Sequence, residues 1–273
     1  MSLIDFSIIV PFYNKEETIE PCIQGLLDQD YPKDRYEIIF VNNNSVDNSC
    51  SIISNYPSVK LIQEKIQGAY VARNAGILAS KGDFLVFSDA DALTPKNWLS
   101  NIHFALSKEN LDIVIGWYRP AGTTKLLQIH SLLVCERIKA ALAKKQASMI
   151  TASASNLIIK KSVFEKEGLF MNVPRSEDKY FVLRCFEKGY KIGFNEEIGV
   201  VRNDINSLGV ALRKNFTYGY ANALYIDRRF SPLKGLIWKF LLKYSLAGAG
   251  LLLFSLFYYA GYFLGFLKRK TEF

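Results

Sequence analysis

The sequence has few of the side chains that most often bind zinc or cross-link a chain. Its 273 residues include only 2 histidines and 4 cysteines. The cysteines form neither a CxxC pair nor a cluster with histidine, which excludes the common zinc sites and argues against a disulfide framework. A chain of this kind suits a reducing compartment. The residues concerned are Cys22, Cys50, Cys135, Cys185, His103 and His130.

Internal repeats, low-complexity linkers and a recognisable signal peptide are also missing. The sequence starts MSLIDFSIIVPFYN, without a basic segment ahead of an apolar stretch and without a cleavage site. We therefore expect no leader, and we expect residues 1–225 to fold as one domain.

Acidic residues are outnumbered. The chain carries 34 Lys and Arg against 26 Asp and Glu, which gives a formal net charge of +8. This balance favours an anionic partner, such as nucleic acid, an acidic membrane surface or a phosphate-bearing ligand. The basic residues are dispersed or lie close to the C-terminal apolar segment, and no nucleic-acid recognition motif is present, so nucleic acid is not an expected partner.

Short apolar runs alternate with helical patterns along the first part of the chain, and this order predicts an α/β fold. A parallel sheet with helices on both faces is the usual result of such alternation. Ligands then bind beyond the carboxyl ends of the strands. The expected strands are 6–10, 36–41, 59–63, 84–88, 112–117, 156–160 and one beginning at 191; the expected helices are 18–29, 50–55, 69–79, 96–108, 125–145, 161–167 and 178–188.

Two aspartates, Asp89 and Asp91, follow the apolar run 84–88 in the sequence VFSDADALTP. Alternation along an extended chain places both carboxylates on one side, where each raises the pKa of the other. A divalent cation between them would relieve this repulsion, and Asp-x-Asp at a strand end is a common way to hold Mg²⁺ or Mn²⁺ beside phosphate oxygens. A solvated turn is the alternative.

Two other places in the sequence offer charged groups for catalysis or binding. Glu177 and Asp178 begin a predicted helix in the sequence SEDKY. They are either an N-terminal cap or a general base that deprotonates a hydroxyl. Arg73, on the predicted helix 69–79, either reaches a nucleotide at the edge of the sheet or is a surface charge.

Residues 245–267 read SLAGAGLLLFSLFYYAGYFLGFL, without a charge. This length fits a membrane-spanning helix of about 20 residues. The prediction is a C-terminal membrane helix or hairpin within a basic, membrane-anchoring region, residues 226–273. Single-span, hairpin and monotopic arrangements stay open, as does a buried helix. The excess of basic residues before the segment favours a cytoplasmic location for the domain that precedes it.

The motifs, taken in order, resemble those of the inverting family 2 glycosyltransferases of the GT-A fold, a Rossmann-like fold. The resemblance covers nearly all of residues 5–225. It rests on SIIVPFYN, VNNNSVDNS, ARNAGILASKG, SDADALTP and the pair SASN and SEDKY, in the family's order and spacing.

The resemblance implies a set of site residues. Asp178 would be the catalytic base, supported by Glu177. Asp89 and Asp91 would bind the divalent cation, Mn²⁺ or Mg²⁺, and Asp91 would be the more direct ligand. The nucleotide would be bound by Pro11, Tyr13, Asn14, Asn43, Arg73 and Asp89, and the acceptor or phosphate by Asn156, Arg202, Arg213 and Lys214.

The sequence departs from the family pattern at two points. Asn42 and Asn43 stand where relatives often have two aspartates, so the preferred nucleobase stays open. No histidine follows His130, although relatives often carry one after the last strand. Arg202 is one of the residues that could replace it.

The expected function is transfer of a sugar from a nucleotide-diphosphate sugar, with inversion, at the cytoplasmic face of a membrane. The expected acceptor is lipid-linked: a polyprenyl phosphate, a lipid-linked saccharide or a glycolipid, in cell-surface glycan or glycoprotein biosynthesis. A nucleotidyltransferase is one alternative, but it would need a Gly-rich basic loop after the first strand, where this chain has PFYNKEE. A catalytically silent, membrane-tethered sugar-binding homologue is the other, and it predicts damage to motifs that are intact here.

Overall fold

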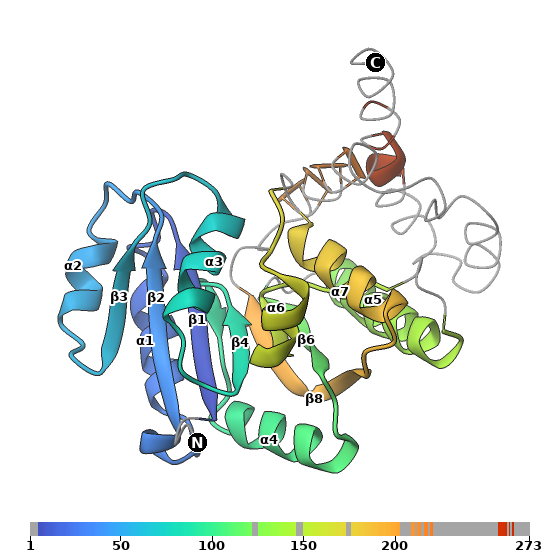
Figure 1. Ribbon diagram of the computed structural model, residues 1–273. Coiled ribbons are helices and arrows are strands. Elements are labelled where there is room, and N and C mark those ends of the chain that lie inside the picture. The colour runs from blue at the N-terminus through green and yellow to red at the C-terminus, as the bar shows by residue number, and fades with distance from the viewer. Residues whose placement is uncertain are drawn as a thin grey trace. The chain divides into compact units, whose positions relative to one another are not determined.

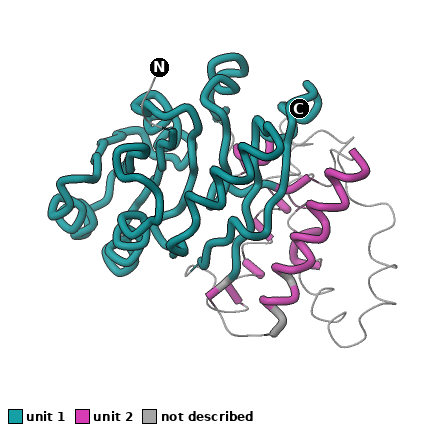
Figure 2. The backbone as a smooth tube through the Cα atoms, turned by 90° about the horizontal axis from the view of Figure 1, so that it is seen from below, with its two compact units in different colours: residues 1–119, 152–172, 181–203 teal, residues 120–151, 173–180, 204–273 magenta. Residues whose placement is uncertain are grey.

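The structure is a computed structural model with two compact units (Figure 2). It describes residues 5–121, 125–145, 150–172 and 176–202, together with 209, 210, 212, 213, 216, 217, 219, 220, 256–260, 262 and 264. Unit 1 contains Met1–Arg119, Ala152–Asn172 and Phe181–Asn203, and unit 2 contains Pro120–Thr151, Val173–Tyr180 and Asp204–Phe273. Each unit is described by itself. The domain boundary predicted near residue 225 falls outside the described residues.

Unit 1 is built on a twisted sheet whose first part is parallel, as expected from the alternation of strands and helices (Figure 1). Its strands lie in the order β3-β2-β1-β4, and each pairs in parallel with its neighbours. The apolar residues of the central strands β1 and β2 are buried on both faces, which is typical of parallel strands. The bounds are β1 Phe6–Phe12, β2 Tyr36–Asn42, β3 Val59–Gln63 and β4 Phe84–Ser88.

The first strand is longer than predicted, because it continues through Pro11 to Phe12. Pro11 has no N–H to donate to a neighbouring strand. It is tolerated because β4 pairs with β1 only as far as Ile9, so Pro11 lies where β1 has β2 alone beside it.

Beyond β4 the strands pair in antiparallel fashion. The described strands form one sheet in the order β3-β2-β1-β4-β7-β6-β8-β5. β7 runs antiparallel to both β4 and β6, and β5 runs antiparallel to the end of β8. The short β5 was not predicted from the sequence, and β8, of which only the beginning at residue 191 was predicted, continues to Arg202. The bounds are β5 Ala92–Leu93, β6 Ile113–Pro120, β7 Asn156–Lys160 and β8 Ile192–Arg202.

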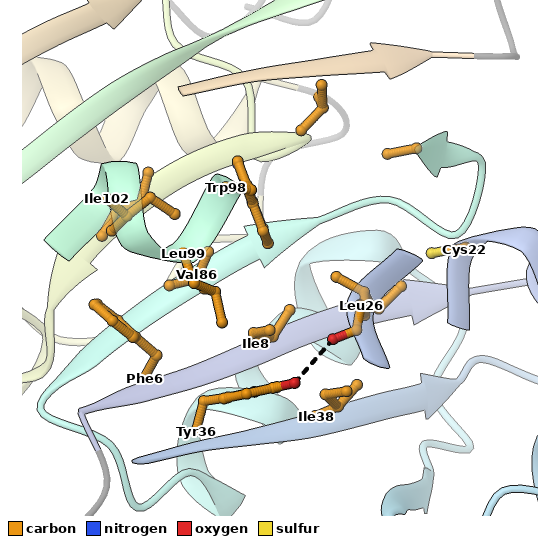
Figure 3. Packing of buried hydrophobic residues seen from close by; sticks show 14 of the residues in the cluster. Phe6, Ile8, Cys22, Leu26, Tyr36, Ile38, Val86, Trp98, Leu99 and Ile102 are labelled. Carbon is orange, nitrogen blue, oxygen red and sulfur yellow. Dashed lines mark hydrogen bonds between the residues drawn. The ribbon is translucent and has the colours of Figure 1, made fainter. Parts of the chain in front are cut away.

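One face of the sheet is covered by α1 (Ile19–Leu27), α2 (Ser49–Ser54) and α4 (Trp98–Glu109). Figure 3 shows side chains from this layer packed on the strands, and the Tyr36 hydroxyl donates a 3.2 Å hydrogen bond to the Leu26 carbonyl. Thr18, expected as the first residue of this helix, directly precedes α1, and its hydroxyl makes no capping hydrogen bond. The core residues drawn and labelled include Phe6, Ile8, Ile38, Val86, Trp98, Leu99 and Ile102.

The other face of the sheet is covered by α3 (Ala69–Ala79) and α6 (Lys161–Glu167). A Cβ at Gly76 would lie 2.4 Å from Ile9 Cγ2, so α3 approaches the strands too closely for a larger residue. Beside it, the rings of Phe87, Phe164, Phe170 and Phe181 form a cluster with centroids 4.5–5.9 Å apart. This packing fixes the parallel strands from both sides and so fixes their carboxyl ends.

Unit 2 contains α5 (Lys125–Ala143) and the first turn of α7 (Glu177–Glu187). None of the helices in the described part of the chain combines the length and apolar character needed to cross a bilayer. The apolar segment predicted to anchor the chain, residues 245–267, lies outside the described residues apart from 256–260, 262 and 264, which are helical.

Candidate active site

The loops after β1 and β2 brace each other at the carboxyl end of the parallel strands. Asn14 adopts a left-handed conformation, with φ of 49°, which turns the chain after β1. Its side-chain oxygen accepts a 2.9 Å hydrogen bond from the Val46 N–H, and its own N–H donates to Ser45 Oγ at 3.0 Å. Glu16 makes a similar exchange with the same loop, because its N–H donates to Asp47 Oδ2 and its carboxylate accepts from the Asn48 N–H, both at 3.0 Å. The two loops therefore form one rigid rim.

Three consecutive asparagines hold the loop between β3 and α3. Asn43 makes three hydrogen bonds to the backbone of this loop. Its amide nitrogen donates to the Glu64 and Ile66 carbonyls, and its oxygen accepts from the Gly68 N–H at 2.7 Å. Asn42 and Asn44 reach the same loop, at Gln63 and at the Lys65 carbonyl. An aspartate has no N–H to donate, so the departure from the family's aspartates has a structural reason.

Asp89 lies in the turn after β4, between two guanidinium groups. Arg73 of α3 is 3.2 Å from Oδ1 and Arg202 of β8 is 3.2 Å from Oδ2. Both arginine side chains are about nine-tenths buried. Arg202 also donates to Ser155 Oγ at 3.0 Å and lies over the ring of Tyr118. Charge-assisted contacts of this kind fix the direction of a carboxylate.

Asp91 is more deeply buried, at 4% exposure, and forms an ion pair with the ammonium of Lys15 from the β1–α1 loop. Cys22 of α1 lies next to this turn, and its thiol donates to the Asp89 carbonyl at 3.6 Å. Burial, and then the charges of Asp91 and Asp89, raise the pKa of that thiol well above its usual range. Cys22 therefore acts as a neutral packing residue beneath the site.

The donor set at this turn suits a hard divalent cation. Asp91 already binds a cationic group through one carboxylate oxygen, and Asp89 stands two residues away. Among the described residues, no group of three or more His, Cys, Asp or Glu side chains gathers at one point. The remaining ligands would then be waters and phosphate oxygens, which is the usual arrangement for Mg²⁺. Because both oxygens of Asp89 face guanidiniums, Asp91 is the better candidate for direct coordination.

The predicted residues lie in several different environments. Tyr13 is half exposed at the rim and Pro11 lies just before it. Asn156 is buried at the start of β7, where its amide donates to the Trp117 and Ile198 carbonyls and accepts from Trp98. These bonds use both N–H groups of the Asn156 side chain and one lone pair of its oxygen. Arg213 is exposed in unit 2, and Lys214 lies outside the described residues.

Glu177 and Asp178 begin α7 and belong to unit 2. Ser176, with φ of 68°, turns the chain into the helix, and Asp178 Oδ1 accepts a 2.7 Å hydrogen bond from the Lys179 N–H. Their position in the first turn is favourable for carboxylates, because the helix dipole is positive there. Burial and the nearby Arg137 guanidinium lower the pKa of Lys179 to about 8, although Asp178 acts in the opposite direction.

Lys15 was not among the residues predicted from the sequence, and Arg202 was predicted as an acceptor or phosphate residue that could replace the family's histidine. The structure brings both to the Asp-x-Asp turn, together with Arg73. The signal for Lys15 was its position directly after PFYN, in a loop already assigned to the nucleotide pocket. No sequence signal pointed to Arg202 as a partner of Asp89.

Comparison with known proteins identifies the class of protein that this fold and site define. The model of Glycosyl transferase family 2 matches residues 7–168, which is more than half of the chain. The chain therefore belongs to glycosyltransferase family 2, as its motifs predict, and the predicted α/β fold of the GT-A type is confirmed.

Three similar proteins illustrate the family. Glycosyltransferase AglE of Haloferax volcanii is 29% identical over 222 residues, 78% of this chain and 71% of the relative. The dolichyl N-acetyl-alpha-D-glucosaminyl phosphate 3-beta-D-2,3-diacetamido-2,3-dideoxy-beta-D-glucuronosyltransferase of Methanococcus voltae is 24% identical, over 82% of this chain and 74% of that protein. The mannosyltransferase PcManGT from Pyrobaculum calidifontis, solved with GDP-Man and Mn²⁺, has a TM-score of 0.65 and 20% identity, over 97% of this chain and 84% of that one.

Proposed function

We propose that this protein transfers a sugar from a nucleotide-diphosphate sugar to a lipid-linked acceptor at the cytoplasmic face of a membrane, with inversion at the anomeric carbon and with Mn²⁺ or Mg²⁺ bound. The products would enter cell-surface glycan or glycoprotein biosynthesis. Membership of glycosyltransferase family 2 supports the reaction class. We propose in addition the class of donor, the cation, the stereochemistry of transfer, the acceptor and the cellular location.

The observation that carries the proposal is the ionic cluster at the end of β4. Three cations, Lys15, Arg73 and Arg202, contact the two carboxylates of Asp89 and Asp91. Sugar transfer leaves a nucleoside diphosphate, on which negative charge develops as the glycosidic bond breaks. Preorganised cations stabilise such charge most when they are partly shielded from water, as the two arginines are here.

Asp91 would hold the divalent cation, with Asp89 beside it. The cation supplies charge neutralisation for the diphosphate leaving group when it is bound. The PcManGT structure with GDP-Man and Mn²⁺ has the same fold and supports this choice of cation and donor class. Asn43 does not narrow the choice of nucleobase, because its side-chain amide is already hydrogen-bonded to the backbone of the β3–α3 loop.

Asp178 would be the general base. In one displacement, the acceptor oxygen attacks the anomeric carbon, the bond to the diphosphate oxygen breaks with its electron pair, and the acceptor proton passes to the Asp178 carboxylate. A single displacement inverts the anomeric configuration and needs no covalent intermediate. Glu177, buried directly before it, would support the first turn of α7.

The lipid-linked acceptor is supported by two features of the sequence and by one relative. The apolar segment 245–267 and the basic residues that precede it would bring the domain to anionic headgroups. The Methanococcus voltae relative carries a dolichyl phosphate sugar in its name. These arguments are independent of the donor site.

The proposal is tested with UDP-, GDP- and dTDP-sugars, radiolabelled in the sugar, added with Mn²⁺ or Mg²⁺ to membranes that contain the full chain. The label is expected in the organic phase after extraction, with one nucleotide preferred. A chain lacking residues 230–273 is expected to lose transfer to membrane lipids. Full transfer by that truncated chain to a soluble acceptor would contradict the lipid-linked acceptor.

The two alternatives predict other results in the same assay. A nucleotidyltransferase would release pyrophosphate from a nucleoside triphosphate, and a silent homologue would bind the donor without transfer. The intact carboxylates Asp89, Asp91 and Asp178 favour the transferase over the silent homologue.

A further inference from the structure

The backbone of Lys15 is fixed on both sides. Its N–H donates a 2.9 Å hydrogen bond to the hydroxyl of the buried Ser49, at the start of α2. Its carbonyl accepts from the N–H groups of Thr18 and Ile19, at 3.0 and 2.9 Å, in the turn that leads into α1. The position of the Lys15 Cα is therefore fixed by hydrogen bonds within the loops that follow β1 and β2, and this fixes the base of its side chain.

The side chain reaches Asp91, and the two partners differ in freedom. The ammonium of Lys15 contacts Asp91 Oδ2; the Asp91 side chain is 5% exposed and the Lys15 side chain is 33% exposed. Asp91 is confined in the tight turn between β4 and β5, whereas Lys15 carries its charge on a flexible stem that is partly open to solvent. One partner is fixed and the other is able to move.

We propose that Lys15 is the resident counter-ion of Asp91, and that it moves from Asp91 to the donor diphosphate when a divalent cation binds. This inference rests on the proposed function, because it takes the turn at Asp89 and Asp91 to be the donor site. The lysine ammonium and the divalent cation compete for the same carboxylate. The displaced ammonium then adds a positive charge beside the diphosphate.

The charges of the cluster show why this exchange matters. In the described part of the chain, three cationic side chains contact the two carboxylates of this cluster, so positive charges outnumber negative ones among these five groups. A divalent cation alone would have to displace the Lys15 ammonium from Asp91, close to the guanidiniums of Arg73 and Arg202, so it binds weakly. A nucleoside diphosphate removes both obstacles, because it neutralises the added charge and accepts the ammonium. Cation and nucleotide should therefore each strengthen binding of the other.

The test compares the wild type with Lys15→Met, which keeps the length of the side chain and removes its charge. Mn²⁺ binding is measured from the electron paramagnetic resonance signal of free Mn²⁺, without nucleotide. Binding of UDP and of GDP is measured by calorimetry at saturating Mn²⁺. The variant is expected to bind Mn²⁺ alone roughly 5-fold more tightly, and to bind its preferred nucleotide roughly 5-fold to 20-fold more weakly, in line with typical coupling between two ligands.

Two further variants serve as controls. Lys96→Met removes a lysine whose ion pair with Asp28 is exposed on both sides, and it should change neither affinity. Lys15→Arg retains a cation at the Asp91 carboxylate, and it should bind Mn²⁺ as weakly as the wild type. Lys15→Gln repeats the Lys15→Met measurement if the methionine variant does not fold.

The outcomes separate this inference from the proposed function. If the wild type binds nucleotide in a Mn²⁺-dependent manner and Lys15→Met binds Mn²⁺ alone no more tightly than the wild type, the exchange is wrong and the donor site stands. If neither protein binds Mn²⁺, with or without UDP or GDP, both proposals are overturned. Opposite shifts of the two affinities in Lys15→Met support the exchange.

Discussion

The guanidinium of Arg202, at the end of β8, lies 3.2 Å from Asp89 Oδ2 in the turn after β4. Arg73 of α3 holds the other oxygen of the same carboxylate at the same distance. Asp89 thus fastens the last strand and the helix α3 to the parallel part of the sheet. We propose that it shapes the site by holding two cations in place, and that Asp91 coordinates the divalent cation directly.

Replacing Arg202 with methionine should lower both stability and donor affinity. The Asp89 carboxylate keeps Arg73 but loses its second buried cation, so the free energy of unfolding should fall by about 1–3 kcal/mol. Urea denaturation and calorimetric nucleotide titration measure the two effects. The control, Arg35→Met, removes an exposed partner of Asp5 and should cost less than about 1 kcal/mol. Equal effects of the two changes would show that Arg202 has no special role.

Asn43→Asp, which restores the residue type common in the family, should destabilise this protein. The change removes two N–H donors and points a carboxylate at the Glu64 and Ile66 carbonyls. The expected loss in unfolding free energy is about 1–3 kcal/mol, measured by urea denaturation. Asn44→Asp loses hydrogen bonds at an exposed position and should have a smaller effect. A stable Asn43→Asp variant with unchanged nucleotide affinity would contradict a structural role for the amide.

Asn156→Ala should destabilise the protein, because this buried side chain joins three elements. It leaves the Trp98 indole N–H and the Trp117 and Ile198 carbonyls without the amide that joins α4, β6 and β8. We expect a loss of about 2–4 kcal/mol on denaturation. The control Asn101→Ala removes one hydrogen bond to the Glu197 carbonyl near the surface and should cost less than about 1 kcal/mol. If Asn156→Ala is stable but loses transfer activity, the result would contradict a structural role and would support the acceptor or phosphate role predicted from the sequence.

Much of unit 1 could be predicted, because local patterns determine its elements. The bounds of β3, β4, β7, α3 and α6 agree with those expected, since each is a short run rich in apolar residues or a helical pattern. The two-residue β5 could not be predicted, because it exists only through its pairing with the end of β8. Pro11 was read as the end of a strand, although it is acceptable where β1 has one neighbour.

Site residues that belong to a sequence motif could be predicted. Site residues that are brought together only by tertiary contacts could not. Asp89, Asp91 and Arg73 were identified from their motifs, and the structure places Asp89 and Arg73 in contact. The ion pair between Lys15 and Asp91 joins distant parts of the chain, and no local pattern reveals it. No local pattern reveals the contacts of Asn43 either. Its place in the motif suggested a contact with the nucleotide, and in the structure its side-chain amide is hydrogen-bonded to a neighbouring loop.

Lys179 should make stability depend on pH in the alkaline range. Its pKa falls from 10.5 to about 8 on folding, chiefly through burial. Between these values the unfolded chain holds more protons than the folded one, so the contribution of this group to stability rises with pH across that window. Lys179→Met should therefore be more stable than the wild type at pH 7, by up to about 3 kcal/mol, and the advantage should shrink at pH 10.

Denaturation of both proteins at the two pH values measures this difference, because other titrating groups are common to both. Lys166→Met, at an exposed position near the end of α6, is the control and should show no such pH dependence. A constant difference between Lys179→Met and the wild type from pH 7 to pH 10 would mean that Lys179 has an ordinary pKa.

The most direct test of the central claim is the rate of sugar transfer in membranes with Mn²⁺, compared among the wild type, Asp91→Ala and Asp178→Ala. The account predicts transfer by the wild type from one nucleotide sugar, and a fall of roughly 100-fold or more in each variant, since one loses the cation ligand and the other the base. Transfer by both variants at the wild-type rate would contradict it.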